Sequence, residues 1–409
     1  MSAEALDPRR LRINVKCIRA MNFTWMFMLI MPVIVPFFGS VGLTPGQVFQ
    51  VQAIFGMAIV LLEVPTGYLS DVIGRKRCLV LAGALHGLAF TVLASVQGFG
   101  GVVVFELLAA LAVCLYSGTD VALMYESLEE LGEHSQGRRA LGQRLFWMQV
   151  GETSAALVGG WIAVISLRQV AVWNAIVGWL PFFVALFLVD IPRPRLDRHG
   201  HLQNLGYIWR ELFVRSALVR WVLLNLIAYG LSTLLAVWVF QGYWAHMQVD
   251  LSFFGYLWAS YNLTVALAGR VAHRFEVAVG VRATIACIAT LPVVGFLGLA
   301  WTAGDPGVES AVGLGLALGI LFQLGRGLTQ VVLKDELNAR VPADLRATAN
   351  SMSSLGVRLG YALVGPLLGV LIDGPGYPVA LGSCAALFVL VGLFLALPLA
   401  RRLGPDVGT

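Results

Sequence analysis

Five charged residues lie inside long apolar stretches of this sequence, where a charge usually has a purpose. They are Glu63, Asp120, Glu152, Arg326 and Arg358. A charge at the depth of a lipid bilayer costs at least about 2.5–3.5 kcal/mol, so each one needs a partner, a water-filled cavity or a function. Counted along a helix from the nearest charged boundary, all five fall at roughly 9–18 Å. We therefore expect them in one layer.

These groups suit two kinds of chemistry. A carboxylate held away from water keeps a proton more firmly than one in water and exchanges it when its surroundings change, so Asp120, Glu152 and Glu63 are candidates for proton coupling. A buried arginine holds an anion, so Arg326 and Arg358 are candidates for binding an anionic solute. The alternative stays open that these acids and bases only close a gate by pairing with one another.

Other polar and aromatic residues in the apolar stretches are candidates of a weaker kind. Asn22 and Asn225 stand at matching positions and are expected to line a cavity, although capping or hydrogen bonding between helices explains them equally well. Glu106, near the end of an apolar run, is expected to be hydrated. Trp258 belongs to a set of aromatics expected mainly in packing or at the lipid surface.

The elements that position these residues follow from composition. The chain has 409 residues, 58% hydrophobic and 12% charged, whereas a soluble domain carries roughly 25% charged residues. This excludes a soluble protein and predicts an all-α membrane protein with twelve transmembrane helices. The spans are expected near 18–39, 47–70, 78–96, 102–125, 144–165, 170–190, 219–243, 251–272, 282–301, 311–333, 348–372 and 379–399.

The distribution of basic residues predicts orientation. Of the 28 lysines and arginines, Arg168 alone falls in the alternate loops, and Arg326 and Arg358 fall inside spans. The others precede the first span or lie in the remaining loops and the C-terminal tail. Cytoplasmic loops retain positive charge, so we expect both termini in the cytoplasm and the chain in the inner membrane. Small clusters of bases between apolar runs do not suit nucleic-acid binding.

A polar linker over residues 191–216 separates an N-terminal bundle, 1–190, from a C-terminal bundle, 217–409. Its residues 202–213 have helical apolar spacing, which predicts a helix on the membrane surface. Residues 197–201 read DRHGH, but two histidines in a solvated linker are not assigned a metal. The five cysteines are scattered, so neither a disulfide nor a metal site is expected.

The two halves repeat one another weakly. Residues 67–71 match 269–273, residues 156–159 match 362–365, and residues 118–126 match 327–335. All three offsets are near half the chain length, which predicts two pseudo-symmetric six-helix bundles related by a two-fold axis along the membrane normal. The repeat makes Glu152 and Arg358 equivalent positions of the two halves with opposite charges, which suggests an ion pair between the halves.

Residues 67–77 read GYLSDVIGRKR, between the second and third spans. Gly67 and Gly74 allow close helix approach and a tight turn. Asp71 is expected to cap a helix start, and Arg75 to reach Glu126 at the end of the fourth span.

This segment resembles the loop G-x-L-[AS]-D-[RK]-x-G-R-[RK]-[RK] of the major facilitator superfamily, with Val72 in place of a basic residue. The resemblance covers the whole chain and implies that Gly67, Asp71, Gly74, Arg75 and Glu126 form a conformational latch. Residues 116–120, 125–128 and 346–348 also look like bacterial drug and small-molecule exporters of this family.

We therefore expect a monomeric secondary active transporter that moves a small organic solute by alternating access, with protons driving export. The alternative is an importer or uniporter of an organic anion. No phosphate-binding G-x-x-x-x-G-K-[ST] segment occurs, so ATP is not the direct energy source, and we expect no cofactor. An enzyme is disfavoured, because neither a cluster of histidines within the spans nor a nucleophile with its base is evident.

Overall fold

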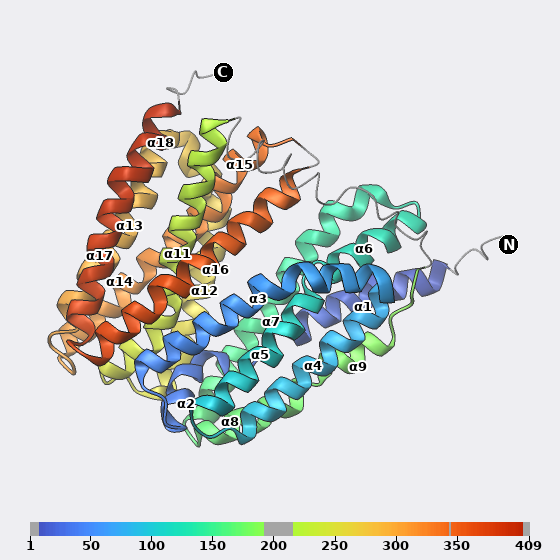
Figure 1. Cartoon of the computed structure of the whole chain (residues 1–409), viewed down its shortest axis with the longest axis horizontal. Helices are drawn as coiled ribbons and strands as arrows, with labels where there is room; N and C mark the ends of the chain where they lie inside the picture. Colours follow the sequence, from blue (N-terminus) through green and yellow to red (C-terminus); the bar gives the residue numbers. More distant parts are fainter. Residues whose placement is uncertain (1–7, 192–215, 343–344, 404–409) are drawn as a thin grey trace. The chain divides into compact units, whose positions relative to one another are not determined.

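The computed structural model describes residues 8–191, 216–342 and 345–403, which form helices and short connections without a strand (Figure 1). Ten helical segments of the described chain are long and apolar enough to cross a membrane. Two further long helices, α7 (Gly137–Ala163) and α12 (Phe254–Val279), lie where the fifth and eighth spans were predicted but are more polar. The all-α membrane fold is confirmed, and the number twelve stays a prediction.

Contacts divide the described chain into two compact units. The first contains residues 8–43, 54–191 and 251–259, and the second contains 44–53, 216–250 and 260–403 without 343 and 344. Each unit thus includes a short segment from the other half of the sequence. The predicted linker helix and the DRHGH segment lie outside the described residues.

The first unit is a helical bundle in which α1 packs on α6, α7 and α9, while α4 packs on α5, α8 and α9. Its core includes Ile18, Met21, Leu79 and Leu115, all fully buried. Besides α7 its helices are α1 (Pro8–Met26), α2 (Ile34–Ser40), most of α3 (Pro45–Ile73), α4 (Arg75–Ser95), α5 (Gly98–Tyr116), α6 (Thr119–Glu130), α8 (Leu167–Val177) and α9 (Leu180–Leu186).

The second unit is also a bundle, in which α13 packs on α14 and α17, and α11 packs on α14 and α16. Two π-helical turns interrupt it, η5 (Thr329–Leu333) and η7 (Gly392–Ala396). Besides most of α12 its helices are α11 (Ala217–His246), α13 (Val281–Thr302), α14 (Glu309–Leu328), α15 (Lys334–Arg340), α16 (Arg346–Asp373), α17 (Tyr377–Val391) and α18 (Leu397–Arg402).

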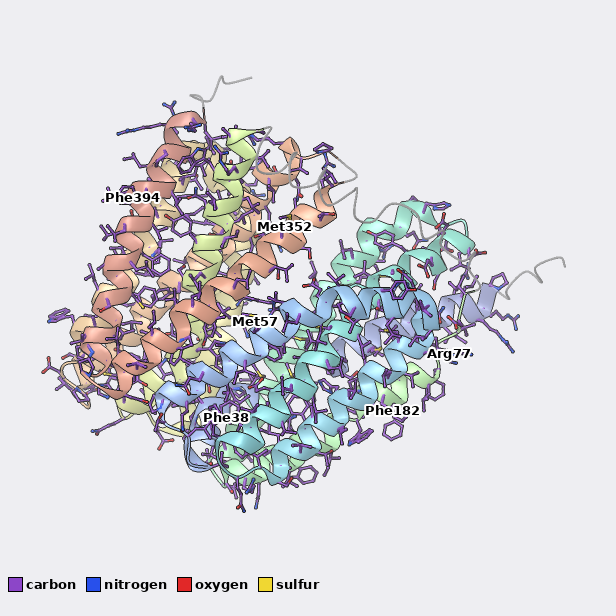
Figure 2. All side chains as sticks on the ribbon, viewed as in Figure 1. Phe38, Met57, Arg77, Phe182, Met352 and Phe394 are labelled. Carbon is purple, nitrogen blue, oxygen red and sulfur yellow. The ribbon has the colours of Figure 1, made fainter. Side chains whose placement is uncertain are left out.

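The outer surfaces of both units carry large apolar side chains. Trp161, Leu363 and Phe394 are 75%, 73% and 68% exposed, and Figure 2 shows Phe394 pointing away from its bundle. Exposed apolar surface of this kind is unfavourable in water and suits contact with lipid.

Helices extend beyond the apolar runs that predicted them. The first begins at Pro8, so the bases expected before it, including Arg12, Lys16 and Arg19, lie on α1 itself. That expectation was wrong because arginine and lysine are good helix formers, and because Leu11 and Val15 continue the buried face of the helix toward its N-terminus. Arg144, expected in a loop or at a span boundary, likewise lies well inside α7.

Two glycines begin equivalent helices with the same unusual backbone. Gly74 precedes α4 with φ +92° and ψ 150°, and Gly280 precedes α13 with φ +84° and ψ 154°. Side chains rarely tolerate positive φ, so glycine is required at both turns. They lie 206 residues apart (280 − 74), the offset at which residues 156–159 repeat as 362–365. The repeat thus extends to backbone conformation.

Small residues bring α7 against α1 and its continuation. Gly151, Ala155 and Gly159 recur every four residues of α7. A Cβ on Gly151 would overlap the Phe23 carbonyl oxygen, and one on Gly159 would overlap that of Leu29. Such spacing lets helix backbones pack closely in membranes, where tight contact stabilises helix pairs.

We therefore expect Gly159→Ala to lower the free energy of unfolding by about 1–3 kcal/mol, because the added methyl group forces the backbones apart. Gly142→Ala is the matched control, since it lies on the same helix with open space where its Cβ would be. That substitution should be neutral or stabilising by up to about 1 kcal/mol. Melting temperatures in detergent compare the two variants, and equal values would contradict the packing argument.

Candidate functional site

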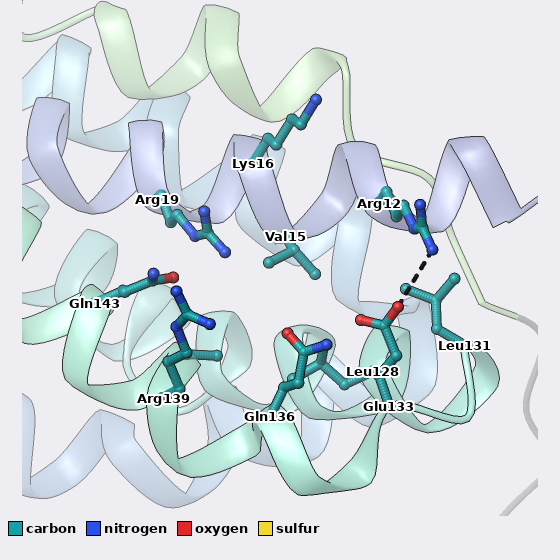
Figure 3. A pocket seen from close by; sticks show the side chains of 11 residues that line it. Arg12, Val15, Lys16, Arg19, Leu128, Leu131, Glu133, Gln136, Arg139 and Gln143 are labelled. Carbon is teal, nitrogen blue, oxygen red and sulfur yellow. Dashed lines mark hydrogen bonds and ion pairs between the residues drawn. The ribbon is translucent and has the colours of Figure 1, made fainter.

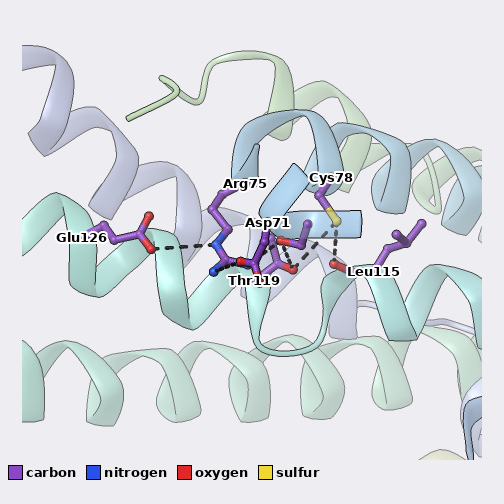
Figure 4. Close-up of polar contacts among 7 residues, drawn as sticks. Asp71, Arg75, Cys78, Leu115, Thr119 and Glu126 are labelled. Carbon is purple, nitrogen blue, oxygen red and sulfur yellow. Dashed lines mark hydrogen bonds and ion pairs between the residues drawn. The ribbon is translucent and has the colours of Figure 1, made fainter. Parts of the chain in front are cut away.

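The end of α3, the start of α4 and α6 are joined by polar contacts around Arg75 (Figure 4). Arg75 forms an ion pair with Asp71 at 2.6 Å, and its Nε lies 3.8 Å from Glu126 Oε1. It also donates to Ser70 Oγ at 2.6 Å. The Ser70 hydroxyl in turn accepts from Thr119 at 3.1 Å. One base thus holds two acids and links three helices.

The structure differs from the sequence expectation for Asp71. Gly74, without any side-chain cap, is the N-cap residue of α4, whereas Asp71 lies within the last turn of α3. The capping role was wrong because α3 continues past Asp71 to Ile73, which turns the carboxylate toward Arg75. Gly67 lies on the exposed side of α3, and no described atom lies within 4 Å of the place its Cβ would occupy.

Asp120 is fully buried in the first turn of α6 and forms an ion pair with Arg144 of α7, Oδ2 to Nε, at 2.6 Å. The helix N-terminus adds to the stabilisation of this carboxylate. Arg144 was missed as a partner because it was assigned to the boundary of an apolar run. The signal that identifies it is its helical register, since α7 begins seven residues earlier, at Gly137.

Glu152 lies half-buried on α7 and accepts a hydrogen bond from Trp258 Nε1 at 3.1 Å. Trp258 is 7% exposed and belongs to the part of α12 that lies in the first unit. Gly255, one turn earlier, is so close to α7 that a Cβ would overlap the Ala156 carbonyl oxygen. The sequence placed Trp258 among aromatics expected mainly in packing or at the lipid surface, and no local signal connects it to Glu152.

A comparable contact in the second unit holds the first turn of α3 against the last turn of α16. Asp373 accepts a hydrogen bond from the Gly46 backbone N–H at 2.9 Å and one from the Thr44 hydroxyl at 2.7 Å. A Cβ on Gly369 would lie 2.7 Å from Gly46 Cα. A carboxylate at a helix N-terminus is favoured by the helix dipole. Sequence reasoning missed this contact as well.

The two asparagines are fully buried within their own units. Asn22 donates to the Ile18 carbonyl oxygen at 2.7 Å and accepts from the Tyr116 hydroxyl at 2.8 Å. Asn225 donates to the carbonyl oxygen of Leu395, in η7, at 3.0 Å. These bonds agree with the interhelical role that the sequence left open, rather than with exposure to a cavity.

The remaining candidates lie on long helices. Glu63 on α3, Arg326 on α14 and Arg358 on α16 are half-buried, and each is engaged with other groups of the chain. Glu106 on α5 is 3% exposed and is engaged with other groups of the chain, so the expectation that it is hydrated was wrong. A pair of Glu152 with Arg358 stays a prediction.

Comparison with known proteins agrees with this architecture. The profile of the Major Facilitator Superfamily matches residues 18–348. A search of curated proteins by sequence returns no match.

Solved structures share the fold at low sequence identity. The nucleoside transporter NupG is 14% identical with a TM-score of 0.72, covering 97% of this chain and 99% of NupG. A D-xylose-proton symporter is 14% identical with a TM-score of 0.71, covering 95% and 97%. A bacterial homologue of the human lysosomal transporter Spinster is 15% identical with a TM-score of 0.66, covering 96% and 97%. On its profile match, the chain belongs to the Major Facilitator Superfamily of membrane transporters.

Proposed function

We propose that the protein is a secondary active transporter that exports a small organic solute by alternating access, driven by the proton gradient across the cytoplasmic membrane. The observation that carries this proposal is the hydrogen bond from Trp258 to Glu152. It joins an acid of α7 to α12, a helix from the C-terminal half of the sequence whose first residues lie in the same unit as α7. Movement of α12 relative to α7 during the transport cycle would break this bond and change the surroundings of the carboxylate, as proton coupling requires.

Glu152 suits this role better than Asp120. Asp120 is already balanced by Arg144 within one unit and has no exposure, which suits a fixed pair that organises α6 and α7. Glu152 is half-buried, accepts a hydrogen bond from the Trp258 indole and is engaged with other groups of the chain as well, so its surroundings depend on more than one neighbour. We keep Glu63 as a further candidate for proton coupling.

In the same proposal, residues 67–77 act as the latch that the family resemblance implies. Arg75 connects Asp71 to Glu126 and so transmits movement of the α3–α4 turn to α6. With both termini in the cytoplasm, this turn lies on the cytoplasmic side, and the Asp373 contact with Gly46 lies on the outer side. The Arg75 contacts would then stabilise the conformation that is closed on the cytoplasmic side, and the Asp373 contact would stabilise the one that is closed on the outer side.

The latch predicts that Asp71→Asn slows transport about tenfold, the size of a modest coupling free energy. The neutral amide loses its ion pair with Arg75, whereas α3 and α4 keep their helices and the turn at Gly74. The measurement is initial uptake rate in proteoliposomes, with melting temperature as the check on folding. Glu130→Gln, an exposed acid at the end of α6, is the control. Full activity of a stable Asp71→Asn variant would show that residues 67–77 only fix the orientation of the chain in the membrane.

Uptake by the purified protein in proteoliposomes, with and without a pH gradient, tests the main proposal. Nucleosides, D-xylose and organic acids are suitable first solutes, because the fold is shared with a nucleoside transporter and a D-xylose-proton symporter. We expect at least one solute to accumulate only when the gradient is present. Movement that equilibrates regardless of the gradient would replace the proposal with a uniporter.

A second candidate is import or uniport of an organic anion, favoured by the half-buried Arg326 and Arg358 on apolar helices. Arg326→Lys keeps the charge but loses the planar fork that binds carboxylate through two hydrogen bonds. An anion-binding role predicts a KM raised about tenfold, the loss of one such bond. Arg346→Lys, exposed at the start of α16, should leave KM unchanged. An unchanged KM for Arg326→Ala would remove Arg326 from the site.

A further inference from the structure

The first unit contains a basic cavity that takes no part in the proposed transport cycle. It lies between α1, the end of α6, the turn η2 (His134–Gln136) and the start of α7, and none of the proposed coupling or latch residues lines it (Figure 3). Its volume is about 450 Å³. Pockets for small ligands usually measure about 300–1,000 Å³, so the cavity has room for more than a single inorganic ion.

The walls of this cavity carry an excess of positive charge. Arg12, Lys16 and Arg19 line the cavity from α1 and Arg139 lines it from α7; Arg12 and Arg19 point toward α6 and α7, whereas the Lys16 side chain points away from Arg139 (Figure 3). The single lining acid, Glu133, bonds Arg12 at 3.3 Å. Four bases against one acid leave three positive charges without compensation in the lining. Bases on neighbouring turns of one helix repel one another, so a bound anion would stabilise the cluster.

Arg19 provides an independent sign of a missing partner. Its Nε is buried, and no acceptor among the described residues bonds to it. A buried donor without an acceptor costs free energy, and the cost is larger for a charged group. The guanidinium of Arg139 and the amides of Gln136 and Gln143 line the same space. Together they place hydrogen-bond donors from α1, η2 and α7 around one space, which suits a ligand rich in acceptors.

The floor of the cavity is apolar. Val15, Leu128 and Ala140 are 8%, 3% and 5% exposed and belong to the core of the unit. An apolar floor beneath basic walls suits an amphiphile that carries its charge at one end. Basic pockets between helices at the cytoplasmic surface have the character that binds acidic lipid headgroups.

We propose that this cavity binds a phosphoryl group, carried either by an anionic phospholipid or by a soluble phosphate. Arg19 and Arg139 hold the phosphoryl oxygens through charge-assisted, bidentate hydrogen bonds. Lys16 adds charge at the rim, and Arg12 remains partly neutralised by Glu133. Binding ties the first helix to α7 without involving the latch or Glu152.

The test measures ligands bound by the full-length protein after delipidation in neutral detergent. The probes are phosphatidylglycerol, phosphatidylcholine and inorganic phosphate, counted per chain by native mass spectrometry for the lipids and by equilibrium dialysis for phosphate. The test variant is Arg19→Gln/Arg139→Gln. The control is Arg9→Gln/Arg10→Gln, which removes the same charge from exposed positions on α1 outside the cavity. Melting temperatures without ligand show that both variants are folded.

We expect phosphatidylglycerol to bind more tightly than phosphatidylcholine, and the test variant to bind it about tenfold or more weakly, while the control binds as the parent does. Saturable binding of inorganic phosphate alone, lost in the test variant, would assign the soluble source. An equal loss in both variants would mean diffuse attraction to positive charge and would overturn the site. Absence of binding by all three probes would overturn it as well.

Discussion

Glu152→Gln is expected to abolish solute accumulation driven by a pH gradient while leaving solute exchange at zero gradient intact. The amide imitates a permanently protonated acid and still accepts the hydrogen bond from Trp258. A transporter that cannot release the proton keeps its conformational cycle for exchange, because exchange moves no net proton. Accumulation and counterflow in the same proteoliposomes measure the two activities.

Two further variants make this result specific to Glu152. Trp258→Phe removes the indole donor but keeps the acid, so gradient-driven accumulation should persist with an altered pH dependence. Asp120→Asn should retain coupling if the Asp120–Arg144 pair is only structural. Full gradient dependence in both Glu152→Gln and Asp120→Asn would show that neither acid carries the proton. It would favour the alternatives that these acids only close a gate by pairing with bases, or that the protein is a uniporter.

Arg144→Gln is expected to lower the free energy of unfolding by about 3–5 kcal/mol, the usual cost of removing one partner from a buried ion pair. Asp120 has no exposure, so its carboxylate would be left without its base inside the bundle. The double variant Asp120→Asn/Arg144→Gln removes both charges and should recover most of this loss, because amide and amide can still hydrogen bond. Melting temperatures in detergent and the yield of monodisperse protein report both effects.

The exposed ion pair Arg12–Glu133 supplies the comparison. Its arginine side chain is 67% exposed, so Arg12→Gln should change stability by less than about 1 kcal/mol. If Arg144→Gln were as mild as Arg12→Gln, the Asp120–Arg144 pair would not hold the bundle together. If the double variant were no more stable than Arg144→Gln alone, the loss would come from packing of the arginine rather than from the orphaned charge.

The sequence predicted features that a short motif or the ends of predicted spans fix. The tight turn at Gly74 follows from the motif, and the contact between Arg75 and Glu126, although distant in sequence, follows from the ends of the spans that carry them. The same reasoning was wrong for Asp71, because a capping role requires knowing the residue at which a helix ends. It was also wrong for Glu106, since hydropathy places a residue along a helix but not on a face.

Partners that are distant in sequence escaped prediction for a different reason. Trp258 and Glu152 are 106 residues apart, and Asp373 is 327 residues from Gly46. Their meeting depends on how whole helices pack, which no local pattern encodes. Arg144 was closer, at 24 residues from Asp120, and a helical start at Gly137 would have revealed it. The roles of Asn22, Asn225, Arg326 and Arg358 in binding a solute remain predictions.

The contacts of Gly46 with Gly369 and of Gly160 with Gly255 are made by residues without side chains. Close packing of the two backbones stabilises each contact, but no side chain interdigitates across it, so the helices can separate without repacking a core. We expect conformations with and without such a contact to differ by only a few kcal/mol. A small solute or a single proton, whose binding supplies free energy of that size, would then be enough to choose between them.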